Sequence, residues 1–213
     1  MSEIIGTRIC DTHALPDIDA LAERLIATAL RLQIRIVTVE SCTAGLMAHA
    51  LSRPFGAASA LAGGFITYTK DAKEKLVDVP RNLLEEYTAV HAEVARAMAV
   101  GALKRSQADC ALAVTGVTGS EPDEDGNPIG RAFIGTARGS RTAALHCEFG
   151  ELAPDALTHA TMQAALCFML AQLGDEGARR SLQAAQADER QTRRPGEGSG
   201  SLAAGRTMAS PRW

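Results

Sequence analysis

The chain has 213 residues, of which 46% are hydrophobic and 22% charged, and its formal net charge is −3 at pH 7. This length and apolar content suit one packed domain, and the weak net charge without clustered Lys and Arg argues against a nucleic-acid-binding protein. The five cysteines lie far apart without a Cys-x-x-Cys pair, so they predict neither a disulfide framework nor a zinc site.

The first fifteen residues, Met1–Leu15, show no regular pattern and are predicted to be a flexible segment. They contain no basic start leading into an apolar stretch, and the chain has no run of about 18 apolar residues. We therefore expect a protein of the reducing cytoplasm that has no membrane contact. Over Pro16–Leu32, apolar residues recur at helical spacing after an opening proline, which predicts a covering helix.

The next part of the chain changes abruptly from apolar to small polar residues. Ile34–Val39 is rich in β-branched residues, which predicts a buried strand, and Thr43–Leu51 is predicted to be a helix. Ser41 lies at this junction, where the first N–H groups of a helix lack partners and can stabilise an anion. Two interpretations stay open: Ser41 or Thr43 is a helix N-cap, or Ser41 is a nucleophile whose oxyanion meets the N–H groups of Cys42 and Thr43.

The elements that follow are a strand, three helices, three strands and a closing helix. Their predicted ranges are Ala60–Thr69, Asp71–Leu76, Pro80–Tyr87, His91–Arg105, Cys110–Thr115, Ile129–Ala137, Thr142–Phe149 and Pro154–Leu173. Ala-, Leu-, Val- and Ile-rich elements of both kinds predict a layered α/β or α+β domain over residues 16–174. Residues 175–213 are rich in Arg, Gln, Ser and Gly and predict a largely disordered tail, whose first part could continue as a helix to about Arg190.

A serine nucleophile needs a base to accept its proton. The five histidines suggest no Ser-His arrangement, because none has an evident acidic residue to orient it, and no Gly-x-Ser-x-Gly motif occurs. Lysine is the other candidate, since Tyr68 and Lys73 lie at a strand end and a helix start. The alternative is that Lys70, Lys73 and Lys75 form a solvated helix face. Only a buried lysine, its pKa lowered from about 10.4 toward about 7 to 8, could act as the base.

Several dispersed motifs occur in the order, and nearly the spacing, of one known family. They are Glu40–Gly45, Gly64–Tyr68 with Lys73, Ala89–Val90, and Ala113–Gly116 with Gly119 and Pro128–Gly130. Over about Leu15–Leu173 the chain therefore resembles the CinA C-terminal domain family. The resemblance implies an α/β fold, a three-layer α/β/α single domain with a mixed central sheet.

The same resemblance implies an activity. Active members of the family are nicotinamide-nucleotide amidases, which hydrolyse nicotinamide mononucleotide to nicotinic acid mononucleotide and ammonia without a metal or another cofactor. On the matching positions Ser41 would be the nucleophile, Lys73 its base and Tyr68 a proton relay or stabiliser. The substrate-binding positions would be Glu40, Cys42, Thr43, Thr115, Gly116 and Gly119.

Two further hypotheses remain beside the amidase, whose expected partner is a small-molecule nucleotide. Ser120–Asp125 carries acids that would repel a phosphate, and Gly150–Pro154 contains no arginine, which favours a diverged non-catalytic relative that binds a nucleotide or a protein. The last hypothesis is self-association. Small residues along the predicted helix His91–Arg105 would let this helix pack closely against a second copy, and the closing helix could pack in the same way.

Overall fold

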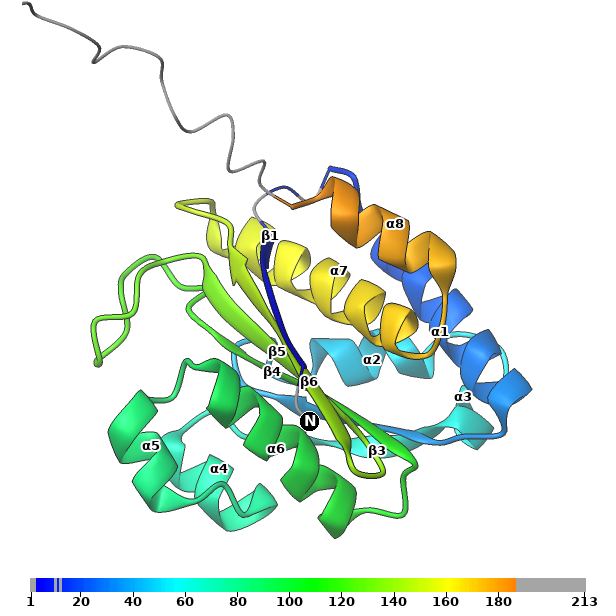
Figure 1. The fold of residues 1–213 in the computed structure, drawn as a ribbon, viewed down its shortest axis with the longest axis horizontal. Helices are drawn as coiled ribbons and strands as arrows, with labels where there is room; N and C mark the ends of the chain where they lie inside the picture. The colour runs from blue at the N-terminus through cyan, green and yellow to red at the C-terminus, as the bar shows by residue number, and fades with distance from the viewer. Residues whose placement is uncertain (1–2, 10, 12, 187–213) are drawn as a thin grey trace, which may run out of the picture.

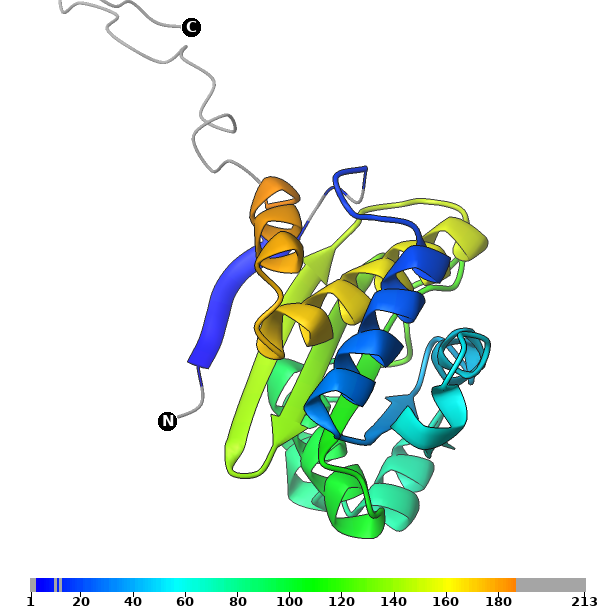
Figure 2. The same cartoon turned by 90° about the vertical axis from the view of Figure 1, so that its right-hand side faces the viewer.

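The structure, a computed structural model, describes residues 3–9, 11 and 13–186. These residues form one sheet with helices on both of its faces, as the perpendicular views in Figure 1 and Figure 2 show. The predicted three-layer α/β/α single domain with a mixed central sheet is confirmed.

The strands of the sheet do not follow chain order. They are β1 (Glu3–Ile9), β2 (Ile36–Glu40), β3 (Leu61–Ile66), β4 (Cys110–Gly116), β5 (Arg131–Arg138) and β6 (Arg141–Glu148). Their order across the sheet is β1-β6-β5-β4-β2-β3, and β5 is antiparallel to both of its neighbours, while the other described pairs are parallel. Because β2, β3 and β4 are parallel, their carboxyl ends meet at one edge of the sheet.

The helices divide into two layers. The described residues form α1 (Ile18–Leu32), α2 (Leu46–Ser52), α3 (Ala57–Ala60), α4 (Lys70–Val77), α5 (Arg81–Tyr87), α6 (Ala92–Arg105), α7 (Pro154–Gln172) and α8 (Glu176–Ala184). Helices α1, α2, α3, α7 and α8 pack on one side of the sheet, and α4, α5 and α6 pack on the other. A hydrophobic core fills the space on each side.

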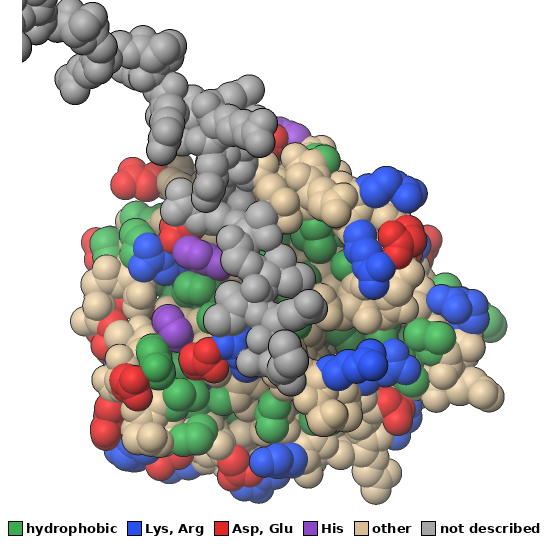
Figure 3. Space-filling model, in the orientation of Figure 1, with side chains coloured by type: hydrophobic (Ala, Val, Ile, Leu, Met, Phe, Trp, Pro, Cys, Tyr) green, Lys and Arg blue, Asp and Glu red, His purple; other side chains and the backbone are tan. Residues whose placement is uncertain are grey.

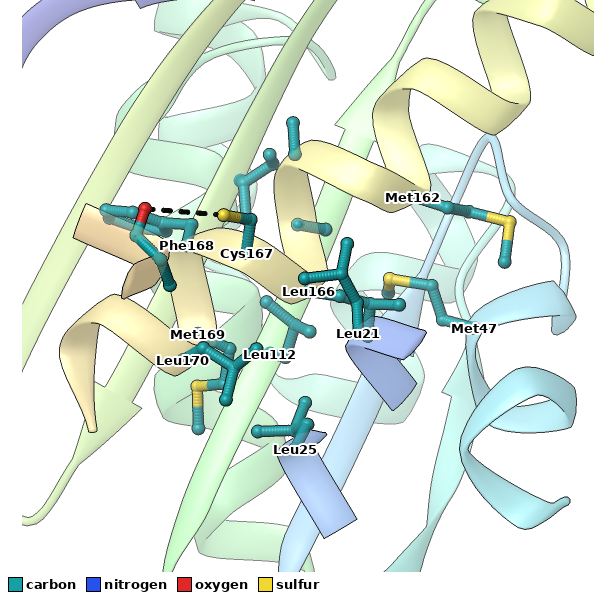
Figure 4. Packing of buried hydrophobic residues seen from close by; sticks show 14 of the residues in the cluster. Leu21, Leu25, Met47, Leu112, Met162, Leu166, Cys167, Phe168, Met169 and Leu170 are labelled. Atoms are coloured by element: carbon teal, nitrogen blue, oxygen red, sulfur yellow. Dashed lines mark hydrogen bonds between the residues drawn. The ribbon is translucent and has the colours of Figure 1, made fainter. Parts of the chain in front are cut away.

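The larger core surrounds α7. Figure 4 shows Leu21 and Leu25 of α1, Met47 of α2 and Leu112 of β4 grouped around Leu166 of α7, and all five side chains are buried. Helix α7 is buried along most of its length, because the sheet covers one side of it and α1 and α8 cover the other. This burial on both sides explains why the sequence of α7 is mostly apolar.

The small residues of α6 allow close packing within the chain. A Cβ atom on Gly101 would lie 1.6 Å from the carbonyl oxygen of Val77 at the end of α4. On the sheet side, a Cβ atom on Gly135 of β5 would lie 2.1 Å from the carbonyl oxygen of Ala95. The first approach lets α6 pack closely on α4 and the second lets α6 pack closely on the sheet, so close packing of α6 is explained without a second copy. Self-association remains a prediction.

The two ends of the described chain differ from the prediction. The segment Met1–Leu15 was expected to lack regular structure. This prediction is wrong for Glu3–Ile9, which forms strand β1 and pairs in parallel with β6. Gly6 interrupts the local β pattern, and pairing with a distant strand offsets that interruption. At the other end, the helix predicted after Gly174 is α8, whose Ala178 and Leu182 are buried, so packing continues past the predicted domain end. The rest of the predicted tail, residues 187–213, lies outside the described residues.

The surface carries both signs of charge. Acidic and basic side chains are interspersed over the part of the face that is coloured by type in Figure 3. Among the described residues, no helix has the length and apolar content to cross a bilayer.

Candidate active site

A cavity lies at the edge of the sheet where β2, β3 and β4 end. Its volume is about 600 Å³, and its wall includes Ser41, which follows β2, and Tyr68, which lies just beyond β3. The end of β4 contributes Thr115 and Gly116, and α4 contributes Lys73. In open α/β sheets, ligands bind outside the carboxyl ends of the strands, so the position is a common one for an active site. Another cavity, lined by the β5–β6 turn, α7 and α8, has a similar volume but lies at the opposite edge, away from Ser41.

The buried residue Lys73 contacts the predicted nucleophile. Its side chain is 0% exposed, and Nζ donates to Ser41 Oγ at 2.9 Å and to the Thr67 carbonyl oxygen at 2.8 Å. Helix α4 fixes this position, because Thr69 caps it by accepting the N–H of Ala72. The interpretation of Lys73 as part of a solvated helix face is therefore wrong.

Burial makes Lys73 a suitable base near neutral pH. Loss of solvation lowers the pKa of Lys73 from 10.5 to about 8, and the positive charge of Lys70 acts in the same direction. The adjacent Cys42 behaves differently, since burial raises the pKa of its thiol to about 12. At pH 8, a large fraction of Lys73 is neutral while Cys42 stays a thiol, so Ser41 is the side chain at this site that can be activated as a nucleophile.

Ser41 lies on a tight turn and not at the start of a helix. The turn contains Ala44 with φ 48° and Gly45 with φ 101°, so the helix begins at Leu46 and not at Thr43 as predicted. Glycine suits the second of these positions because it adopts positive φ without strain. The interpretation of Ser41 or Thr43 as a helix N-cap is therefore wrong, because Gly45 occupies the cap position.

The turn also presents backbone donors. Within the described residues, the N–H groups of Cys42 and Thr43 donate to no other residue, whereas the next N–H, that of Ala44, donates to the Ser41 carbonyl oxygen at 3.2 Å. Successive N–H groups in a turn of this kind form an anion-binding nest. Of these two residues only Cys42 lines the cavity with Ser41, so its N–H group is the candidate donor to an oxyanion.

The buried carboxylate of Glu40 holds this turn in place through hydrogen bonds. Its carboxylate is 1% exposed and accepts five hydrogen bonds. The donors are the hydroxyls of Thr38 and Thr43 and the backbone N–H groups of Gly45, Met47 and Ala48. Neither Glu40 nor Thr43 lines the cavity, so the structure corrects their predicted substrate contact to a role in positioning the loop. The carboxylate caps α2, because it satisfies the first N–H groups of that helix.

We expect Glu40→Gln to destabilise the protein strongly. Either orientation of the glutamine amide would turn its NH2 group toward hydrogen-bond donors, leaving at least one backbone N–H group unpaired and forcing a threonine hydroxyl to reorient. Such a loss should lower the free energy of unfolding by about 2 to 4 kcal/mol. Urea denaturation measures this change, with Glu23→Gln on the exposed face of α1 as the matched control. Equal stability of the two variants would contradict the role assigned to Glu40.

The other predicted site residues occupy the cavity wall in different ways. Tyr68 is 68% exposed, and among the described contacts its carbonyl oxygen, not its hydroxyl, is the group near Ser41, with Oγ donating to it at 3.5 Å. The structure thus places the ring at the mouth of the cavity and not between Ser41 and Lys73. Thr115 is buried and donates to the Ala89 carbonyl oxygen at 2.7 Å, which holds the α5–α6 connection beside the site.

Two glycines complete this wall. A Cβ atom on Gly116 would lie 2.7 Å from Ala132 Cβ on the neighbouring strand β5, so only glycine fits at this position of β4. Gly119 lines the cavity without crowding, and the neighbouring Thr118 hydroxyl donates to the Cys42 carbonyl oxygen at 3.4 Å. The predicted residues Cys42, Thr115, Gly116 and Gly119 therefore share one cavity with Ser41 and Lys73.

The acidic loop after β4, whose acids were expected to repel a phosphate, forms one side of the cavity. Lys70 Nζ donates to Asp125 at 2.7 Å and lies 3.6 Å from Glu124, which joins the start of α4 to this loop. The sequence analysis did not predict this ion pair, for which the opposite charges of Lys70 and Asp125 were the available signal. Within the described residues, no group of three or more His, Cys, Asp or Glu side chains is placed to hold a metal ion.

Comparison with known proteins gives one consistent result. The family described as the CinA C-terminal domain matches residues 18–173. Protein YdeJ of Escherichia coli K12 is 40% identical over 128 residues, which are 60% of this chain and 72% of YdeJ. A CinA-like protein of Colwellia psychrerythraea is 36% identical over 115 residues, which are 54% of this chain but 27% of that longer protein.

Solved structures agree with the sequence matches. The competence/damage inducible protein CihA from Agrobacterium tumefaciens has a TM-score of 0.70 at 35% identity, and the match covers 74% of this chain and 96% of that one. A competence-damaged protein (CinA) superfamily protein from Escherichia coli has a TM-score of 0.70 at 31% identity, with 75% and 97% covered.

Proposed function

The chain belongs to the CinA C-terminal domain family, which includes nicotinamide-nucleotide amidases, and on this premise we propose that it is a metal-independent Ser-Lys amidase. The proposed reference substrate is nicotinamide mononucleotide, whose carboxamide is hydrolysed to the acid and ammonia. The observation that carries the proposal is the 2.9 Å contact between Lys73 Nζ and Ser41 Oγ at the wall of a cavity.

The first half of the proposed reaction acylates Ser41. Neutral Lys73 takes the proton from Ser41 Oγ as this oxygen attacks the amide carbon, and the negative charge moves onto the carbonyl oxygen. The N–H group of Cys42 is the candidate donor to that oxyanion, because Cys42 lines the cavity and Thr43 does not. Collapse breaks the carbon–nitrogen bond, protonated Lys73 returns its proton to the leaving nitrogen, and ammonia departs from an ester on Ser41.

The second half restores the enzyme. A water molecule attacks the ester carbon and gives its proton to neutral Lys73. The ester bond then breaks, and Ser41 Oγ regains a proton from Lys73. The acid product leaves. Because the same amine serves both halves, its pKa must allow it to gain and lose a proton near the working pH.

Ammonia release from nicotinamide mononucleotide tests the proposal. We expect the purified wild-type protein to release ammonia in step with formation of the acid, and the Ser41→Ala protein to release none above the background without enzyme. Equal release by the two proteins would remove this proposal, and release by neither would remove nicotinamide mononucleotide as the substrate.

The rate should rise with pH. Protonated Lys73 cannot accept a proton, and the pKa of Lys73 is lowered to about 8, so kcat/KM should increase through pH 7 and level off above about pH 9. Initial rates between pH 6 and pH 10 give the profile. The exposed residue Lys75 supplies the control, because Lys75→Met should leave the midpoint in place. A rate that stays flat or falls between pH 7 and pH 9 would contradict a lysine base.

A second candidate function is binding without turnover. The carboxylates in the cavity wall are the observation that favours it, because the described part of this wall offers a phosphate no unpaired cation as an anchor. Calorimetry that shows nicotinamide mononucleotide binding to the wild-type protein, together with no ammonia release, would support this second candidate.

A further inference from the structure

The charged groups in the cavity wall are mostly acidic. Five carboxylates and two amines line the cavity, and among the described residues no arginine does so. The acids are Asp71, Glu121, Asp123, Glu124 and Asp125, and the amines are Lys70 and Lys73. A substrate with a negative group would therefore approach a wall of its own sign.

Neither amine is free to bind an anion. Lys73 is fully buried and donates to Ser41 and to the Thr67 carbonyl oxygen, and it must be neutral to act as the base. Lys70 donates to Asp125 at 2.7 Å and lies 3.6 Å from Glu124. A phosphate would have to break the Lys70 contacts to gain a cationic partner.

Some of the acids are already paired and others are not. Asp123 accepts the N–H groups of Asp125 and Asn127 and the Asn127 side-chain amide, so it shapes the loop. Asp71 pairs with Lys75 at 2.5 Å. Glu121, by contrast, is exposed and has no hydrogen bond or ion pair to another described residue.

Glu124 adds to the uncompensated charge. Its side chain is 80% exposed, and its one ion-pair contact, with Lys70, is 3.6 Å long and shared with Asp125. Glu121 and Glu124 together therefore place negative charge beside the site with little compensation. Both lie in the cavity wall that also contains Ser41.

We propose that this cavity selects positively charged carboxamides without a phosphate. This inference rests on the proposed amidase function and narrows its substrate class to a pyridinium nucleoside, such as nicotinamide riboside, over the 5′-phosphate of that nucleoside. The pyridinium cation is attracted by Glu121 and Glu124, whereas a phosphate dianion is repelled. Each carboxylate at about 8 Å changes the affinity for a unit charge by about twofold to fivefold, and the two ligands differ by two charges.

Binding to the Ser41→Ala protein tests this preference without turnover. Calorimetry at low salt should show nicotinamide riboside binding at least about tenfold more tightly than nicotinamide mononucleotide. Glu121→Gln/Glu124→Gln in the same background should remove most of that difference, while Glu23→Gln on α1 should leave it unchanged. About 1 M salt should also reduce the difference in affinity between the two ligands, because the Debye length falls to about 3 Å.

The outcomes separate this inference from the amidase proposal. If nicotinamide mononucleotide binds as tightly as the riboside, or if the double variant leaves the ratio in place, the charge preference is overturned even when ammonia is released. If the riboside binds preferentially but the wild-type protein releases no ammonia from either ligand, the preference stands and the amidase proposal fails.

Discussion

Lys73→Met is expected to abolish ammonia release while leaving the protein at least as stable as the wild type. Without the amine, Ser41 has no neighbouring group to accept its proton, and the loss in kcat/KM should be at least about a thousandfold. The side chain of Met fills the same buried space without a charge. A loss of activity together with retained stability separates a catalytic role from a structural one.

The stability effect has a definite sign and pH window. The pKa of Lys73 in the folded protein is lowered from 10.5 to about 8, so between these pH values the unfolded chain binds more protons and the wild type gains stability as pH rises. Below pH 8 Lys73 is protonated in the folded protein, and burying its charge lowers the free energy of unfolding by about 3 kcal/mol. Two lost hydrogen bonds offset part of the gain in the variant, at about 1 kcal/mol each.

Urea denaturation of Lys73→Met and the wild type at several pH values measures this difference. We expect the variant to be more stable by about 1 to 2 kcal/mol at pH 7, and the advantage to disappear as pH approaches 10.5. Lys75→Met on the same helix is the matched control, because Lys75 is exposed and, among the described residues, its ion pair is the surface contact with Asp71. A large loss of stability in Lys73→Met at pH 7 would contradict the buried, destabilising amine described here.

The second large effect is expected for Ser41→Ala. Removing the nucleophile closes the covalent route, so kcat/KM should fall by at least about a thousandfold. Cys42 cannot replace it, because burial raises the pKa of that thiol to about 12 and keeps it protonated. Ammonia release gives the measurement, and Ser59→Ala on the exposed face of α3 is the matched control.

The fold should survive this change. Ser41 Oγ contacts Lys73 and, at 3.5 Å, the Tyr68 carbonyl oxygen, while Glu40 holds the turn through other residues. Thermal unfolding of Ser41→Ala should therefore stay close to that of the wild type. Residual activity within tenfold of wild type, with the fold intact, would show that Ser41 is not the nucleophile.

Local sequence was sufficient to predict the strands that carry the site. Ile36–Glu40 and Cys110–Gly116 are short apolar runs, and such runs predict buried strands wherever they pair. It did not predict the turn after β2, because two consecutive positive φ values at Ala44 and Gly45 replace the expected first helical turn. The polar residues there suit a cap as well as a turn.

Roles that depend on distant parts of the chain were not predictable from local sequence, and the assignment of Lys73 as the base came from the family resemblance alone. Lys73 has the sequence context of a solvated helix face, and only its packing against Ser41 and Thr67 shows that it is buried. The role of Glu40 was also hidden, because its N–H donors are brought to it by the turn that the prediction lacked. Strand β1 depends on pairing with β6, about 140 positions later in the chain.

Mass spectrometry of the intact protein, quenched with acid during turnover, tests the central claim most directly. We expect a covalent adduct whose mass equals the amide substrate minus ammonia, located on the peptide that contains Ser41 and missing from Ser41→Ala and Lys73→Met. Ammonia release without any adduct in the wild type, or an adduct on a different residue, would contradict a Ser-Lys covalent mechanism.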